Sequence, residues 1–164
     1  MLSSKAFTRQ KRSSDMQPSD RSAQISALYQ EMILDHYRRP RNKGTLENAD
    51  ASVEMKNPLC GDEIGLQVSF AGEAVSDVKF SGRGCSISQA SASMMTQLVK
   101  GKSADEIDAI RKKFRDLMLG NSDAGDSQLG SLRALSGVAR FPARVKCALL
   151  AWNALDSALA ERAG

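Results

Sequence analysis

The chain has 164 residues, of which 41% are apolar, a length and composition that predict one domain with a sizeable core rather than two domains. No stretch approaches the roughly 20 apolar residues of a membrane span, and the start lacks the apolar segment of a secretory signal, so we expect a soluble, cytoplasmic protein with no membrane partner. Much of the formal net charge of +4 lies in residues 1–24, and the nearly neutral remainder, poor in aromatic residues, argues against a nucleic-acid partner.

Residues 1–24 are rich in Ser, Lys, Arg and Gln and have almost no apolar periodicity, which predicts a disordered N-terminal extension. A transit peptide would share this basic, Ser-rich composition, but Asp15 and Asp20 argue against it. The predicted domain therefore covers residues 25–164.

That domain begins with apolar residues at helical spacing from Ile25 until Pro40, which predicts an amphipathic helix. The only histidine, His36, lies near the end of this helix, where an imidazolium would interact favourably with the helix dipole. We interpret His36 as a structural or surface residue, because nothing in its surroundings supports a metal ligand or a catalytic base.

A basic turn follows this helix, from Arg38 to Gly44. Its simplest interpretation is a solvated loop, and the alternative is an electrostatic docking patch for a partner protein. In the second case Tyr37, Arg38 and Arg41 are the candidate partner-binding residues.

Three segments with alternating apolar residues predict an antiparallel sheet: they are centred on Val53–Met55, on 64–70 and on Val78–Phe80. The turn between the first two strands lies at one end of that sheet. The third strand returns to the same end and stops at Cys85, so we expect Cys85 to lie near Cys60.

The turn from Asn57 to Asp62 places the Cys60 thiol and the Asp62 carboxylate two residues apart, with a glycine between them that frees the backbone to turn. Together with Cys85 and Cys147, these residues are three thiols and one carboxylate, a complete tetrahedral set for zinc. An odd cysteine count without a secretory signal argues against a disulfide framework. The alternative is three unrelated buried cysteines.

The second half of the chain predicts helices. One begins at about Cys85, where the helix dipole favours a thiolate, and buries a stripe that runs from Ile87 to Leu98. Ser103 and Glu106 form a capping box that starts another helix, which reaches about residue 119.

The loop over residues 120–126 resembles a calcium loop only superficially, since Leu132 stands where the bidentate glutamate is needed. After a short helix through residues 129–135, a final helix runs from Pro142 to about Arg162, with Trp152 in the core. On this last helix Arg144 and Cys147 share a face, and Arg144 can offset the negative charge of a thiolate site.

The chain resembles the SufU branch of the IscU/NifU-like iron-sulfur cluster assembly family from Ile25 to Ala163. The resemblance implies an α+β fold in which helices pack on a three-stranded antiparallel sheet, and it implies that the four ligand positions converge. The motifs that carry it are Leu28-Tyr29 with Asp35-His36-Tyr37, Pro40-Arg41-Asn42-Lys43-Gly44, Asn57-Pro58-Leu59-Cys60-Gly61-Asp62, Gly82-Arg83-Gly84-Cys85-Ser86-Ile87-Ser88 with Ala90-Ser91, and Arg144-Val145-Lys146-Cys147.

Within this family, the scaffold branch on which clusters are built has a histidine immediately before its last cysteine, where this chain has Lys146. The stretch from about Leu117 to Leu129 also resembles an insertion typical of the SufU type. The resemblance therefore implies a zinc-dependent sulfur acceptor for a SufS-type cysteine desulfurase, with a SufBCD-like cluster scaffold downstream. Two alternatives stay open: a scaffold that holds an iron-sulfur cluster transiently, and a structural zinc module that docks a partner.

The chemistry of the implied site assigns a role to each residue. We interpret Cys60 as the sulfur acceptor, because it lies in a turn that Gly61 leaves mobile. In this hypothesis zinc keeps Cys60 deprotonated, and a partner side chain then replaces Cys60 on the metal while Asp62, Cys85 and Cys147 retain it. Arg144 gives electrostatic support to the site.

Overall fold

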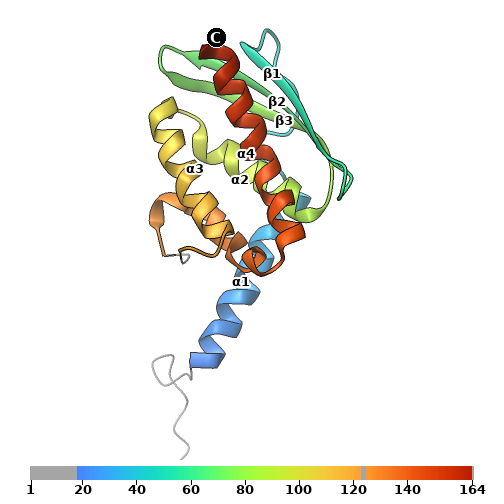
Figure 1. Cartoon of the computed structure of the whole chain (residues 1–164), viewed down its shortest axis with the longest axis vertical. Coiled ribbons are helices and arrows are strands. Elements are labelled where there is room, and N and C mark those ends of the chain that lie inside the picture. Colours follow the sequence, from blue (N-terminus) through green and yellow to red (C-terminus); the bar gives the residue numbers. More distant parts are fainter. Residues whose placement is uncertain (1–17, 123–124, 164) are drawn as a thin grey trace, which may run out of the picture.

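The computed structural model describes residues 18–122 and 125–163, which form a three-stranded antiparallel sheet with helices packed on it (Figure 1). Helices α2 (Ser86–Val99) and α4 (Pro142–Ala163) pack against each other and against the sheet, and α1 (Pro18–Arg38) packs on α2. None of the helices in the described part of the chain is both long and apolar enough to span a membrane. The predicted α+β fold is confirmed.

The sheet has the order β1-β2-β3, with strands β1 (Ala51–Asn57), β2 (Asp62–Ala71) and β3 (Ala74–Arg83). Its register pairs Asn57 with Asp62 and Glu63 with Arg83. Alternate residues of β2 are buried, as the apolar alternation predicts. Because β2 pairs with both neighbours, the turn that carries Cys60 and the end of β3 that leads to Cys85 lie at the same end of the sheet.

Helix α2 (Ser86–Val99) starts immediately after β3, and it is buried on every side rather than along the single predicted stripe. All residues from 88 to 96 are buried, since α1, α4, β3 and the segment η3 (Ser127–Arg140) surround the helix. Small residues such as Ser91 and Ser93 let these neighbours approach closely. The Ser91 hydroxyl donates a hydrogen bond of 2.6 Å to the Ala148 carbonyl of α4.

Helix α4 (Pro142–Ala163) and helix α3 (Ala104–Met118) complete the core. Trp152 is fully buried, as predicted, with its ring centroid 5.6 Å from that of Phe114 on α3. The capping box of Ser103 and Glu106 is present at the start of α3.

The segment after α3 is a 3-10 helix, η3 (Ser127–Arg140), and not the predicted short helix alone. Gly130 has a φ of 53° and divides η3 into two pieces. Asp126 caps its first turn by accepting a hydrogen bond of 2.9 Å from the Gln128 amide. This carboxylate therefore has a structural role as a helix cap.

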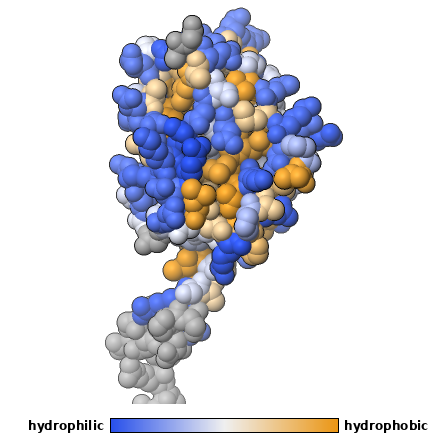
Figure 2. Space-filling view, in the orientation of Figure 1, coloured by the Kyte–Doolittle hydropathy of each residue, from blue (hydrophilic) through white to orange (hydrophobic). Residues whose placement is uncertain are grey.

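Helix α1 (Pro18–Arg38) begins before the predicted domain boundary, so the predicted disordered extension is wrong for residues 18–24. Pro18 suits the first turn of a helix, and Asp20 interacts favourably with its dipole. This end of α1 projects from the body of the domain (Figures 1 and 2). A helix that does not pack on the core needs no apolar face, so the sequence of this end shows no apolar periodicity. Residues 1–17 lie outside the described residues.

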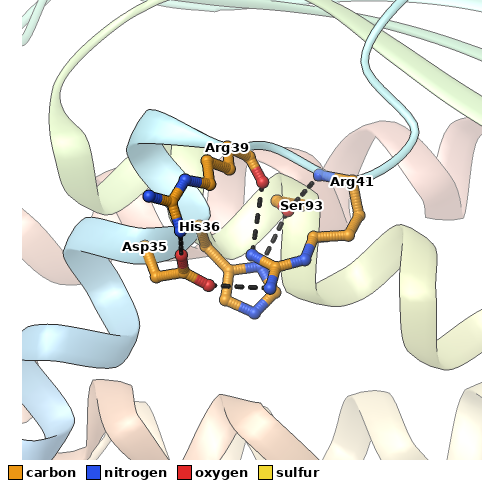
Figure 3. Close-up of polar contacts among 5 residues, drawn as sticks. All are labelled: Asp35, His36, Arg39, Arg41 and Ser93. Carbon is orange, nitrogen blue, oxygen red and sulfur yellow. Dashed lines mark hydrogen bonds and ion pairs between the residues drawn. The ribbon is translucent and has the colours of Figure 1, made fainter.

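The other end of α1 is anchored on α2 by His36, which is only 5% exposed (Figure 3). The Ser93 hydroxyl lies 2.8 Å from His36 Nδ1 and accepts a hydrogen bond of 2.8 Å from the Arg41 amide. The Arg41 guanidinium pairs with Asp35 at 2.7 Å, which lowers the pKa of that carboxyl. Burial, together with the Arg41 charge, lowers the pKa of His36 and disfavours the imidazolium, and the buried ring has a structural role, as the sequence indicated.

We expect His36 to make folding stability depend on pH below about pH 6.5. The folded state has the lower histidine pKa, so between the two pKa values the unfolded state binds more protons, and stability is lost as the pH falls. The slope for one such group is at most about 1.4 kcal/mol per pH unit. Urea unfolding at a series of pH values from about 7.5 to about 5.5 would measure it.

The control is His36→Gln, which removes the only histidine of the chain. Its stability should be lower at pH 7.5 but should depend less steeply on pH. Parallel curves for the two proteins would show that His36 does not carry the pH dependence.

Candidate metal centre

The loop between β1 and β2 is a tight turn that presents Cys60 at its end. The Asn57 carbonyl accepts a hydrogen bond of 3.2 Å from the Cys60 amide, with Pro58 in the position of the turn that favours proline. Gly61 has a φ of 69°, which a residue with a side chain rarely adopts. Leu59 at the tip is 77% exposed, so the predicted turn presents Cys60 beside solvent.

Asp62 is fully buried at the start of β2. Its Oδ1 accepts a hydrogen bond of 2.9 Å from the Cys85 amide, and its Oδ2 lies 3.9 Å from the Cys85 sulfur. One carboxylate oxygen is therefore held by the backbone, while the other faces the thiols. A buried carboxylate is costly unless it is paired or binds a cation.

Cys147 enters the same cluster from α4 and is fully buried. Its sulfur lies 3.0 Å from the Cys60 sulfur, and the ligand atoms of Cys60, Asp62 and Cys147 all lie within 4.8 Å of one another. The Cys85 sulfur lies outside this group of three but beside it, 3.9 Å from Asp62 Oδ2. The structure thus brings the four predicted residues to one place, three of them in the closest arrangement.

Cys85 is the N-cap of α2, as the sequence predicts. Its sulfur accepts a hydrogen bond of 3.5 Å from the Ser88 amide. This contact directs at the sulfur an N–H group of the first helical turn, which has no partner within the helix.

The surroundings of Cys147 disfavour its thiolate form. Burial raises the pKa of Cys147, and hydrogen bonding to Cys60 and Asp62 raises it further. Interaction with Cys85, and then with Cys147, raises the pKa of Arg144, because both sulfurs favour the charged guanidinium. The electrostatic support of the site by Arg144 stays a prediction.

The donor set fits zinc. Zinc binds cysteine sulfur and carboxylate oxygen in a tetrahedral arrangement, and these are the groups that converge here in a partly buried position. Lys146 is exposed, while its neighbour Cys147 is buried.

Two glycines at the end of β3 and immediately after it make room for this arrangement. A Cβ atom on Gly84 would lie 2.5 Å from Asp62 Oδ1 and 2.5 Å from the Ser88 hydroxyl. Gly82 has a φ of 107° and lies against the backbone of Glu63. The Gly82-Arg83-Gly84 spacing before Cys85 is the sequence signal of this close packing.

The residues predicted to bind a partner lie away from the cysteines, at the end of α1. Tyr37 and Arg38 are exposed, whereas Arg41 is partly buried and paired with Asp35. Ser93, which bonds to the Arg41 amide, is eight residues along α2 from Cys85, roughly 12 Å at the rise of an α-helix.

Comparison with known proteins gives a consistent result. The model of the family described as "NifU-like N terminal domain" matches residues 28–160. The zinc-dependent sulfurtransferase SufU of Bacillus subtilis is 48% identical over 143 residues, which cover 87% of this chain and 97% of that protein. The iron-sulfur cluster assembly scaffold protein IscU of Streptococcus pyogenes is 42% identical over 141 residues, which cover 86% of this chain and 88% of that protein.

A solved structure agrees with these relatives. The crystal structure of a putative iron-sulfur cluster assembly scaffold protein for the SUF system from Fervidobacterium islandicum superimposes with a TM-score of 0.74. It is 39% identical to this chain and covers 79% of it, and this chain covers 94% of that one.

We expect Gly84→Ala to weaken metal binding, because the added methyl group would displace the Asp62 carboxylate from its place beside the three cysteines. Overpacking of this kind costs about 1–3 kcal/mol, so zinc affinity should fall by about fivefold to 150-fold. Competition with a coloured chelator would measure the affinity. Gly137→Ala is the matched control, because a Cβ atom there has no neighbour within 4 Å, and equal affinities for the two variants would contradict the expectation.

Proposed function

The chain belongs to the family of the NifU-like N-terminal domain, and on this basis we propose that it is a zinc-dependent sulfur acceptor for iron-sulfur cluster assembly. The sulfur would come from the persulfide of a cysteine desulfurase. The observation that carries the proposal is the exposed turn that places Cys60 against the buried Asp62–Cys147 pair. The similarity to a protein named as a zinc-dependent sulfurtransferase supports it.

The residues that would hold zinc are Cys60, Asp62, Cys85 and Cys147. When bound, zinc stabilises its cysteine ligands as thiolates, which are nucleophiles at neutral pH. Three thiolates and one carboxylate exceed the charge of one zinc ion by two negative charges. Arg144, beside Cys85 and Cys147, offsets part of that excess.

Cys60 is the residue that would accept the sulfur. Its thiolate attacks the outer sulfur of the desulfurase persulfide, so a new S–S bond forms on Cys60 while the old S–S bond breaks. The electron pair of the broken bond leaves with the desulfurase cysteine as a thiolate, and no oxidant or reductant is needed. Cys147 is fully buried and cannot meet a partner's persulfide in the same way.

The partner would dock beside the exposed turn and extend to the end of α1. Tyr37, Arg38 and Arg41 form the basic surface that we propose for a SufS-type desulfurase, with a SufBCD-like scaffold as the later acceptor. Pairing with Asp35 holds the Arg41 side chain in one position, while Tyr37 and Arg38 are free to reach outward. This chemistry and the proposed partners fit a cytoplasmic protein.

A scaffold on which a cluster assembles is the second candidate, because a relative named as a scaffold is 42% identical. Both functions would use the same cysteines and Asp62. Lys146 favours the sulfur acceptor, since the scaffold branch has a histidine at this position.

We expect the zinc-loaded protein to stimulate alanine production by a cysteine desulfurase under limiting reductant. Cys60→Ala should lose at least about 90% of the stimulation, because removal of a reacting nucleophile abolishes the step. Zinc-stripped wild-type protein should also fail to stimulate. Full stimulation by Cys60→Ala would overturn the assignment of Cys60.

The same preparation distinguishes the scaffold. A protein that gives no stimulation but acquires a labile visible chromophore with iron and sulfide would be a scaffold.

The docking surface has its own test. We expect Arg38→Ala to raise the concentration needed for half-maximal stimulation by about twofold to tenfold while the maximal stimulation stays unchanged, as for a rim charge in an interface. Lys112→Ala is the control, because it removes the same charge from the exposed face of α3. Equal effects of the two substitutions would show that only net charge matters.

A further inference from the structure

The carboxamide of Asn57 contacts the acceptor turn with both of its polar atoms. Its Oδ1 accepts a hydrogen bond of 3.2 Å from the Leu59 amide, and its Nδ2 lies 3.4 Å from the Cys60 sulfur as a donor. Asn57 is 8% exposed, and its backbone is fixed at the end of β1 opposite Asp62. It is therefore a rigid group that touches the sulfur from the sheet side.

Few other contacts hold the tip of this turn. Leu59 is largely exposed, and a Cβ atom on Gly61 would meet no atom within 4 Å. The other contacts of the Cys60 sulfur are with Cys147 at 3.0 Å and with the Ala143 carbonyl at 3.9 Å, both on the side of α4. Asn57 is thus the side chain of the turn itself that determines where the sulfur lies.

An N–H donor has a definite effect on a sulfur that carries negative charge. Hydrogen bonds to charged groups are stronger than those between neutral groups, and they withdraw electron density from the acceptor. A thiolate with such a donor reacts more slowly with small electrophiles. The same bond restricts the directions from which the sulfur can attack.

We propose that Asn57 is a positioning residue for Cys60, which holds the acceptor turn through Oδ1 and restrains the acceptor sulfur through Nδ2. This inference rests on the proposed function only for its consequence in sulfur transfer. The contact itself is a property of the turn, and it can be measured without a desulfurase.

Asn57→Asp separates the two contacts, because a carboxylate keeps an acceptor for the Leu59 amide but replaces the donor to sulfur with a second oxygen. In zinc-loaded protein of verified zinc content, we expect Asn57→Asp to raise the rate of Cys60 alkylation by iodoacetamide by about threefold or more, the effect of one hydrogen bond. Mass spectrometry would confirm that Cys60 is the residue modified. Maximal desulfurase stimulation should fall, while the concentration for half-maximal stimulation stays the same.

Asn48→Asp is the matched control. It makes the same change at an exposed residue before β1, at the opposite end of the sheet from Asn57, and it should alkylate at the wild-type rate. Wild-type alkylation rates for Asn57→Asp would overturn the proposal. A wild-type protein that fails to stimulate any desulfurase, but in which Asn57→Asp still speeds alkylation, would overturn the proposed function and leave this inference standing.

A second measurement needs no substitution at Asn57, and it decides the case if Asn57→Asp does not retain zinc. In wild-type protein loaded with an NMR-active cadmium isotope, a hydrogen bond from Nδ2 to the metal-bound sulfur should give a scalar coupling between the Asn57 side-chain amide and the metal. The coupling should disappear in Cys60→Ser. Its absence from the cadmium-loaded wild-type protein would overturn the proposal.

Discussion

The rest of the site depends on the buried carboxylate of Asp62. It lies opposite Asn57 at the end of the sheet and accepts a hydrogen bond from the Cys85 amide, so it joins the β1–β2 turn to the start of α2. Gly84 gives it the space to do so. Since a buried carboxylate needs a positive partner, its position beside the cysteines is what makes this end of the sheet suitable for a metal ion.

Helix α2 connects this end of the sheet to α4 and to the loop after α1. Its N-terminus carries Cys85, its middle bonds through Ser91 to the turn of α4 that follows Cys147, and Ser93 bonds to the loop after α1. Because α2 is buried on all sides, these three positions are fixed relative to one another. The metal centre and the proposed basic docking surface are therefore held by one rigid element.

The site itself has a rigid half and an accessible half. Asp62 and Cys147 are fully buried and are positioned by the sheet and by α4, whereas Cys60 lies at the end of an exposed turn. This division suits a ligand set in which one cysteine must meet an external sulfur while the others keep the metal. The Asn57 carboxamide lies at the boundary, since its backbone belongs to the sheet and its side chain contacts the turn.

The sequence by itself determined the features that depend on neighbouring residues: the alternation of β2, the capping box at Ser103, the turn before Cys60 and the thiol at the start of α2. Only the tertiary structure decided the features that depend on distant residues. Periodicity reports one apolar face, so it missed the all-round burial of α2, and it could not detect a helix where α1 leaves the body of the domain. The lowered pKa of His36 and the contact of Asn57 with sulfur were likewise set by burial and packing, which local sequence does not encode.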